Sequence, residues 1–254
     1  MKTLGVLLVL TLLTTACGAP PSRPESLWDS LPPSGEGSAK SVPAQAWNGA
    51  ETAGNAEGEG SAAEAAGSEP VVEAEEIVGT VVLNEIFYDA VGSDTDGLLF
   101  VELYGTPGLL IGGFRVLFVD GGDGSIDDTI VLPEGERIPG DGYYVVADAR
   151  TGSPDISQVP NPDLIDNFDP QNGPDAVLLT DTDGALLDAV GYGDGVVAMA
   201  ENGLPAFEGQ CAPDVVNGHS LERKEPGIDT GDNFSDFMES ESPTPGAGPV
   251  TPIE

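Results

Sequence analysis

The sequence predicts an all-β domain that follows a disordered amino-terminal stalk. From about residue 78, short runs rich in valine, isoleucine, phenylalanine and tyrosine alternate with clusters of glycine, aspartate and proline, a spacing typical of strands joined by turns. No segment shows sustained helical periodicity, and 35 glycines and 22 prolines among 254 residues suit a turn-rich chain. Strands without intervening helices favour an antiparallel β-sandwich or barrel.

The first segment, residues 1–16, is expected to be a signal peptide. Lys2 precedes an apolar run from Leu4 to Leu13, which is too short to span a bilayer but fits a signal-peptide core. The run ends in Leu13-Thr14-Thr15-Ala16-Cys17, which resembles the lipobox of bacterial lipoproteins, although leucine is commoner than threonine at position 14. The resemblance implies cleavage before Cys17 and lipidation of that cysteine; an ordinary secretory peptide is the alternative. Cys211 would then be the one remaining thiol, with no intrachain disulfide.

Residues 17–77 are expected to form a lipidated, disordered tether. Glycine, alanine, serine, proline and glutamate dominate the segment, so it cannot bury a hydrophobic core. Gly18 follows the cysteine, and by analogy with enteric lipoprotein sorting it favours the outer membrane. The expected location is therefore the cell envelope, as an outer-membrane lipoprotein that faces the periplasm or the cell surface.

The folded domain is expected over residues 78–247, ahead of a disordered tail at 248–254. Two stretches, 152–174 and 193–218, carry no strand pattern and are predicted to be long loops. Eight strands are predicted, near residues 80–88, 98–104, 113–120, 128–132, 142–148, 175–180, 185–191 and 219–223.

The charge of the chain excludes some partners. The 44 acidic and 8 basic side chains give a formal net charge of −36, and nucleic-acid binding needs clustered lysine and arginine. A nucleic-acid partner is therefore not expected, and the membrane is expected to be reached through the lipid alone. Salt adaptation and simple solubility both explain the acidity without any ligand.

Several segments of the domain match a known pattern in order. They are Val82-Leu83-Asn84-Glu85-Ile86, Phe100-Val101-Glu102-Leu103-Tyr104, Gly112-Gly113-Phe114-Arg115-Val116, Pro139 to Val146, Asp188 to Gly193, Ser220-Leu221-Glu222-Arg223 and Asp229 to Gly246. This order resembles the bacterial lamin-tail domain family over about residues 79–247, with departures at Gly105 and His219. The resemblance implies an immunoglobulin-like β-sandwich that binds or scaffolds, and it supplies no catalytic residues.

One loop is a candidate calcium site. Asp120, Asp123, Asp127 and Asp128 lie in a glycine-rich stretch that resembles one turn of a calcium-binding nonapeptide repeat, although Ile126 stands where that repeat has aspartate. A simple hairpin loop is the alternative. The two Asp-Thr-Asp-Gly runs at 94–97 and 181–184 lack the later ligands of an EF-hand and predict hairpin turns. Calcium is thus a possible ligand, and no other cofactor is expected.

Two glutamates stand among apolar neighbours in predicted strands. Glu85 and Glu102 would need a partner if their side chains point inward. Arg115, on the next predicted strand, is the expected partner of Glu102 in a structural ion pair, and outward-facing, solvated side chains are the alternative.

The sequence contains few residues in arrangements that suit catalysis. His219 is the single histidine, and its side chain should point to the opposite face of a strand from that of Ser220. No phosphate-binding loop or nucleophile elbow occurs. The sequence therefore predicts a non-enzymatic, lipid-anchored envelope protein whose domain binds or scaffolds an unknown protein or glycan. A calcium-dependent adhesion or matrix-binding module that uses the 120–128 loop is the alternative, and a hydrolase using Glu85, Glu102 or His219 is a third class.

Overall fold

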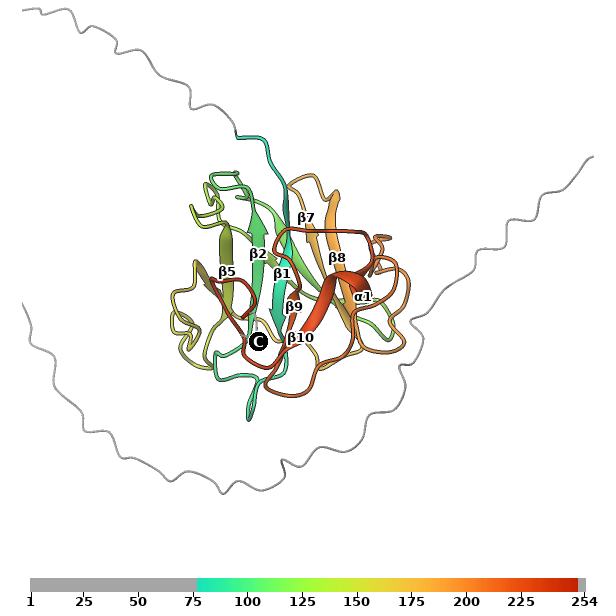
Figure 1. Cartoon of the computed structure of the whole chain (residues 1–254). Coiled ribbons are helices and arrows are strands. Elements are labelled where there is room, and N and C mark those ends of the chain that lie inside the picture. Colours follow the sequence, from blue (N-terminus) through green and yellow to red (C-terminus); the bar gives the residue numbers. More distant parts are fainter. Residues whose placement is uncertain (1–76, 251–254) are drawn as a thin grey trace, which may run out of the picture. The chain divides into compact units, whose positions relative to one another are not determined.

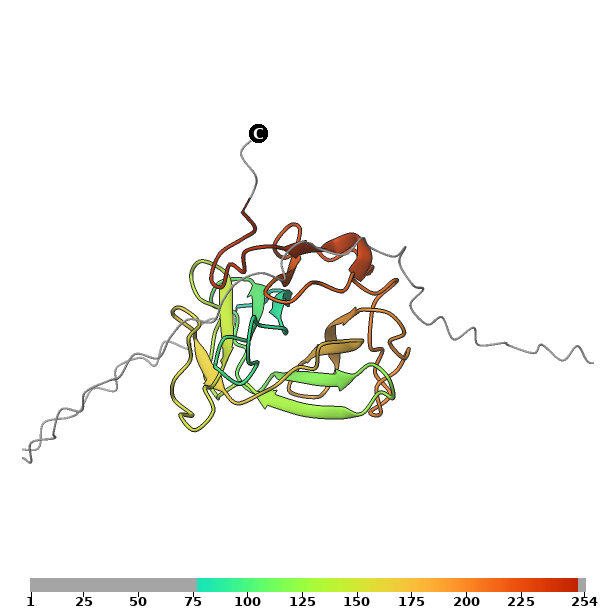
Figure 2. The ribbon, with the colours of Figure 1, turned by 90° about the horizontal axis from the view of Figure 1, so that it is seen from below.

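Two β-sheets face each other in the structure, a computed structural model that describes residues 77–250 (Figures 1 and 2). The larger sheet has the order β10-β9-β1-β2-β5-β6, and the smaller has the order β4-β3-β7-β8. All neighbouring strands are antiparallel except β5 and β6, which are parallel. The strands are β1 (Val81–Phe87), β2 (Phe100–Gly105), β3 (Arg115–Asp120), β4 (Ile126–Val131), β5 (Tyr143–Asp148), β6 (Leu164–Asp166), β7 (Asp175–Thr180), β8 (Leu186–Tyr192), β9 (Ser220–Arg223) and β10 (Phe237–Ser240).

The predicted all-β sandwich is confirmed, and all eight predicted strands are present within about two residues of their expected ends. Two short strands and one helical turn were not predicted. β6 lies inside the stretch 152–174, which was expected to be a loop, and β10 follows the four-residue helix α1 (Asn233–Asp236). None of the helical structure in the described part of the chain is long and apolar enough to span a membrane.

The core between the sheets follows from strand alternation. Leu83 and Leu103 of the larger sheet pack in one buried cluster with Val116, Phe118 and Val190 of the smaller sheet. Because successive side chains of a strand point to opposite faces, the intervening residues point outward from the sandwich. Wherever these outward-pointing residues are apolar or carry a carboxylate, another segment of the chain must cover the outer face of the sheet.

The segment 196–211 covers the outer face of the smaller sheet. Leu117 and Leu178 point outward and pack with Val196, Ala206 and Cys211 in a second buried cluster. This cover explains why every residue of β7 is buried. Cys211 is disulfide-bonded in the structure, whereas lipidation of Cys17 would leave it without an intrachain disulfide, so these two states exclude each other.

Several predictions concern residues that the structure does not describe. The signal peptide at 1–16, the lipidation site Cys17 and the tether up to residue 76 lie outside the described residues, as do residues 251–254. Residues 248–250, predicted to begin a disordered tail, belong to the described part.

Candidate functional site

The predicted calcium loop does not assemble into a shared site. Asp120, Asp123 and Asp128 each use one carboxylate oxygen to accept a nearby backbone amide, at 2.7, 2.9 and 2.7 Å respectively. Asp127 and Asp128 are adjacent on β4 at a register shift, which leaves Asp127 without a cross-strand partner. Asp127 accepts hydrogen bonds from the Gln171 side chain and the Ser125 hydroxyl, and Gln171 also reaches Asp120 at 3.5 Å. Within the described residues the four carboxylates do not form a group of three or more ligand atoms close enough for one metal ion, so the calcium site stays a prediction and the hairpin alternative stands beside it.

We expect calcium to have no specific effect through this loop. Replacing Asp123 and Asp127 together by alanine should leave the calcium dependence of the melting temperature unchanged, because within the described residues this loop does not bring three carboxylates close enough to share a metal ion. The measurement is thermal unfolding with 2 mM calcium, 2 mM magnesium or chelator at constant ionic strength, a concentration above the dissociation constants of about 0.1–1 mM that weak extracellular sites show. A calcium-specific rise that disappears in the double variant would restore the loop as a site.

The predicted ion pair between Glu102 and Arg115 is also wrong. Arg115 lies with Leu117 on the outer face of the smaller sheet, where its guanidinium donates to the carbonyls of Asp181 and Thr182 at 3.3 and 3.2 Å. Glu102 lies on the outer face of the larger sheet and accepts hydrogen bonds from the Asn84 side chain and the Gly246 amide. The whole sandwich therefore separates the two side chains.

Three buried carboxylates form a row across the larger sheet. Glu85 pairs with Glu102 of β2 on one side and with Glu222 of β9 on the other, and all three residues are fully buried. We call them the glutamate row. The carboxyl-terminal segment covers it, since Thr244 donates its amide to Glu85 and Gly246 donates its amide to Glu102 at 2.6 Å. The described residues place no arginine or lysine within ion-pair distance of the row.

Burial without a cation favours the protonated form of the row. Desolvation raises the pKa of Glu102 to about 8, and hydrogen bonds from Gly246 and Asn84 offset only part of this effect. Desolvation likewise raises the pKa of Glu85 to about 7, and the hydrogen bond from Ser220 counteracts it. The pKa of Glu222 is raised for the same reason. The row therefore holds protons at neutral pH.

A second buried cluster is centred on Arg223, which is fully buried at the end of β9. Its guanidinium contacts Asp188 at 2.9 Å and Asp236 at 3.1 Å, and it lies 4.5 Å from the centre of the Phe237 ring. Its Nε donates to the carbonyl of Leu83. Arg223 therefore ties β8 of the smaller sheet to β1 and β9 of the larger one.

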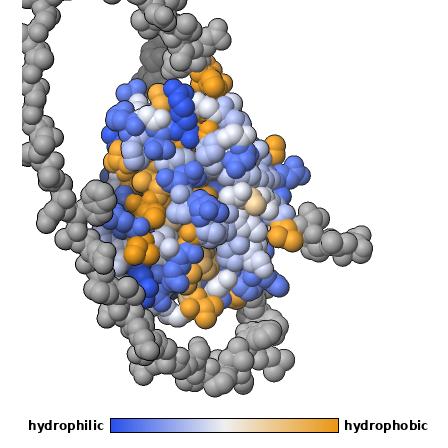
Figure 3. Space-filling view, turned by 90° about the vertical axis from the view of Figure 1, so that its left-hand side faces the viewer, coloured by the Kyte–Doolittle hydropathy of each residue, from blue (hydrophilic) through white to orange (hydrophobic). Residues whose placement is uncertain are grey.

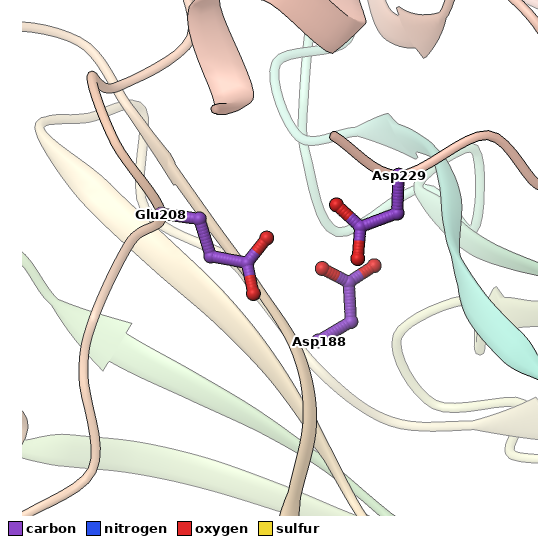
Figure 4. Close-up of side chains that lie close together, drawn as sticks. All are labelled: Asp188, Glu208 and Asp229. Carbon is purple, nitrogen blue, oxygen red and sulfur yellow. The ribbon is translucent and has the colours of Figure 1, made fainter. Parts of the chain in front are cut away.

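Asp188, Glu208 and Asp229 converge (Figure 4), and Arg223 lies within 4.0 Å of two of them, Asp188 and Asp229. One carboxylate oxygen from each lies within 4.8 Å of the others, which is close enough for a shared metal ion. Asp188, however, already accepts hydrogen bonds from Arg223 and from the Leu83 and Ala189 amides. Burial, together with Asp188 and Asp229, raises the pKa of Glu208 to about 7. Arg223 and a proton on Glu208 therefore offset only part of the negative charge of the trio.

The sequence carried one signal for this cluster. Arg223 is the last residue of the run Ser220-Leu221-Glu222-Arg223. An arginine at the end of a predicted strand stands out in a chain that has few basic residues. No sequence pattern near Arg223 identified Asp188 or Asp236 as its partners, because they lie 35 and 13 residues away along the chain.

The histidine and its neighbouring serine do not face each other. Ser220 donates its hydroxyl to Glu85 of the glutamate row. The Nδ1 atom of His219 lies 3.1 Å from a carboxylate oxygen of Glu239. The two side chains therefore serve different contacts.

An open pocket of about 460 Å³ lies beside the trio. Its walls come from the start of β1, the β2–β3 connection, β8 and the β9–α1 connection. They are Gly79, Thr80, Val81, Val82, Leu109, Phe114, Leu187, Gly227 and Asp229. We call this the β1–β8 pocket; its volume lies in the range of binding sites, and Asp229 is its one charged lining residue.

Apolar side chains are exposed around this pocket. Five large ones line it or are within two residues of the lining segments: Ile77, Val78, Leu110, Leu187 and Ile228. Hydrophobic surface also gathers in a broken band on the side that lies to the left in Figure 1, as Figure 3 shows. A second cavity of about 180 Å³, beside Pro243 and Pro245, has no charged lining residue. The β1–β8 pocket is therefore the candidate binding site, since it combines volume, apolar walls and a carboxylate.

No protein-family model and no curated protein matches this sequence. The resemblance to bacterial lamin-tail domains, including the immunoglobulin-like fold that it implies, therefore stays a prediction. The functional assignment rests on the chemistry of the residues themselves.

Proposed function

We propose that this protein is a non-enzymatic, lipid-anchored component of a bacterial cell envelope whose lamin-tail-like β-sandwich binds or scaffolds a partner. The β1–β8 pocket carries this proposal, because it is an open, largely apolar site with one carboxylate and no serine, cysteine, lysine or histidine among its lining residues. Within the described residues, Arg223 holds Asp188 and Asp236, and hydroxyl and amide groups hold Glu85 and Glu102. Their chemistry supports the fold and leaves the pocket for binding.

The test of binding uses a photoreactive amino acid at position 187 of the protein in intact cells. Leu187 lines the pocket and is 36% exposed. The matched control carries the same group at Ile156, which is 55% exposed and is no lining residue of this pocket. We expect a cross-linked adduct from position 187 and none from position 156. Equal labelling at both positions, or none at either, would argue against a binding module.

The anchor is proposed at Cys17, which follows the lipobox-like run. We expect the mature chain to begin at Cys17 with a diacylglyceryl group on its sulfur, and Cys17→Ser to move the protein from the membrane fraction to the soluble fraction. Intact mass measured with and without reductant checks this.

The disulfide at Cys211 gives this measurement a clear alternative outcome. The chain has two cysteines, and a sulfur that carries lipid as a thioether cannot also form a disulfide. A mature chain that retains an intrachain disulfide and carries no lipid would exclude the anchor. The domain would then be secreted without one.

A further inference from the structure

The β1–β8 pocket presents main-chain hydrogen-bonding groups as well as apolar walls. β1 pairs with β2 along its whole length but with β9 only at Glu85 and Ile86. Gly105, opposite Val81, donates its amide to the carbonyl of Gly142 at 2.9 Å. The N–H and C=O of Val81 therefore point away from β2, since antiparallel pairs alternate between bonded and non-bonded positions.

Leu83 confirms this alternation two residues further along the strand. Its N–H donates to Asp188 and its C=O accepts from Arg223, both on the side away from β2. Val81 points its N–H and C=O to the same side, where it lines the pocket. No strand among the described residues pairs with Val81 there. A free donor and acceptor on a strand favour an extended peptide as the occupant.

Leu187 of β8 forms the opposite wall. It stands at a register shift in β8, where Thr180 pairs with Leu186 and Leu179 pairs with Asp188. The shift leaves Leu187 without a cross-strand partner and aims its side chain into the pocket. Together with Phe114 and Leu109 it can enclose one aliphatic or aromatic side chain of a bound peptide.

The negative charge of the pocket indicates which residues flank that apolar side chain in a bound peptide. Asp229 lies on the pocket wall, 31% of its side chain is exposed, and Glu208 and Asp188 stand behind it. The whole chain carries 36 more negative than positive charges. An acidic peptide would therefore be repelled, and a lysine or arginine beside the apolar residue would be attracted.

We propose that the β1–β8 pocket binds an extended peptide segment in which an apolar residue is flanked by lysine or arginine. The segment adds to the open side of β1 at Val81, its apolar side chain enters between Leu187 and Phe114, and its basic side chain reaches Asp229. This proposal deepens the proposed binding function and rests on it, since it names the partner class of the same site.

The test uses the full mature chain in nonionic detergent and three acetylated six-residue peptides. One alternates lysine with valine, one alternates glutamate with valine, and one alternates lysine with serine. We expect the lysine–valine peptide to bind, with affinity falling as salt rises, and both others to bind at least about tenfold more weakly. Fluorescence anisotropy of labelled peptides measures this.

Two substitutions with matched controls locate the site. Leu187→Ala should weaken binding of the lysine–valine peptide about tenfold, whereas Ile156→Ala should not change it. Asp229→Asn should reduce the salt dependence, whereas the same change at Asp155, which is exposed and does not line the pocket, should not. Far-ultraviolet circular dichroism and the melting temperature verify that each variant is folded.

Three results would overturn the proposal. They are equal binding of the glutamate–valine peptide, binding that is insensitive to Leu187→Ala, and binding that appears only after residues 18–70 are deleted, which would identify the tether as the occupant. If no peptide binds while position 187 still cross-links in cells, the partner class is wrong and the binding function stands. If neither occurs, both fail.

Discussion

Replacing Arg223 by methionine is expected to destabilise the domain by about 3–5 kcal/mol, the usual cost of removing one partner from a buried ion pair. The substitution leaves Asp188 and Asp236 buried without their cation and removes the hydrogen bond from Nε to the Leu83 carbonyl. Methionine keeps much of the side-chain volume, so the loss reports mainly on charge. Urea unfolding followed by circular dichroism measures it.

Arg137 provides the matched control. It is exposed and donates to the carbonyl of Gly108, so Arg137→Met should change stability by less than about 0.5 kcal/mol. Adding Asp188→Asn to Arg223→Met should recover part of the loss, because one of the two stranded carboxylates becomes neutral. Equal stability of Arg223→Met and the parent protein would show that the cluster does not hold the two sheets together.

The domain is expected to be more stable at pH 5 than at pH 8. Glu85 and Glu102 have pKa values raised from 4.5 to about 7 and about 8 in the folded state. A carboxyl group whose pKa is higher in the folded than in the unfolded state contributes its whole stabilising effect at pH values below the unfolded pKa. That stability is lost as the pH rises through the folded pKa. Between pH 4.5 and pH 8 the glutamate row should therefore lose stability of the order of a few kcal/mol.

Neighbouring groups act in the same direction. Burial also raises the pKa of Asp188 to about 6 and of Glu208 to about 7. Tyr143, near the covering segment, has its pKa raised to about 12 by burial and by Glu102, so it stays neutral throughout this range. The general repulsion among excess negative charges also weakens as carboxylates are protonated. A variant is therefore needed to isolate the row.

The substitution Glu102→Gln isolates the contribution of the glutamate row to the pH dependence of stability. Glutamine is nearly the same size, can still accept the Gly246 amide, and cannot ionise. The variant should raise the melting temperature at pH 8, leave it nearly unchanged at pH 5, and flatten the curve between them. Glu134→Gln, at an exposed site, should shift neither point. A pH profile of Glu102→Gln that is parallel to that of the parent would mean that Glu102 is ionised when buried.

Much of the fold could be predicted because strand signals are local. Alternating apolar residues bounded by glycine, proline and aspartate located all strands longer than four residues. β6 and β10, with three and four residues, were missed because such short segments carry little periodic signal, whereas the equally short β9 was predicted. β6 and β10 form because β5 and β9 offer open edges to pair with.

The functional residues were harder to predict because their partners are distant. Glu102 was recognised as a carboxylate that needs a partner, but its partner Gly246 lies 144 residues away in a turn-like segment. Arg115 looked suitable because it occupies the next strand. The two sheets, however, turn these side chains to opposite outer faces of the sandwich. The β1–β8 pocket draws its walls from four separate segments, none of which carries a motif.

The sequence by itself determined the strands, the excess negative charge and the fact that some carboxylates lie among apolar neighbours, because composition and periodicity are properties of short segments. Only the tertiary structure decided which sheet each strand joins and therefore which face each side chain takes. It paired Arg223 with Asp188 and Asp236, placed the carboxyl-terminal segment over the glutamate row and left Val81 open beside Leu187. These contacts depend on the crossing of distant strands, and no local pattern encodes them.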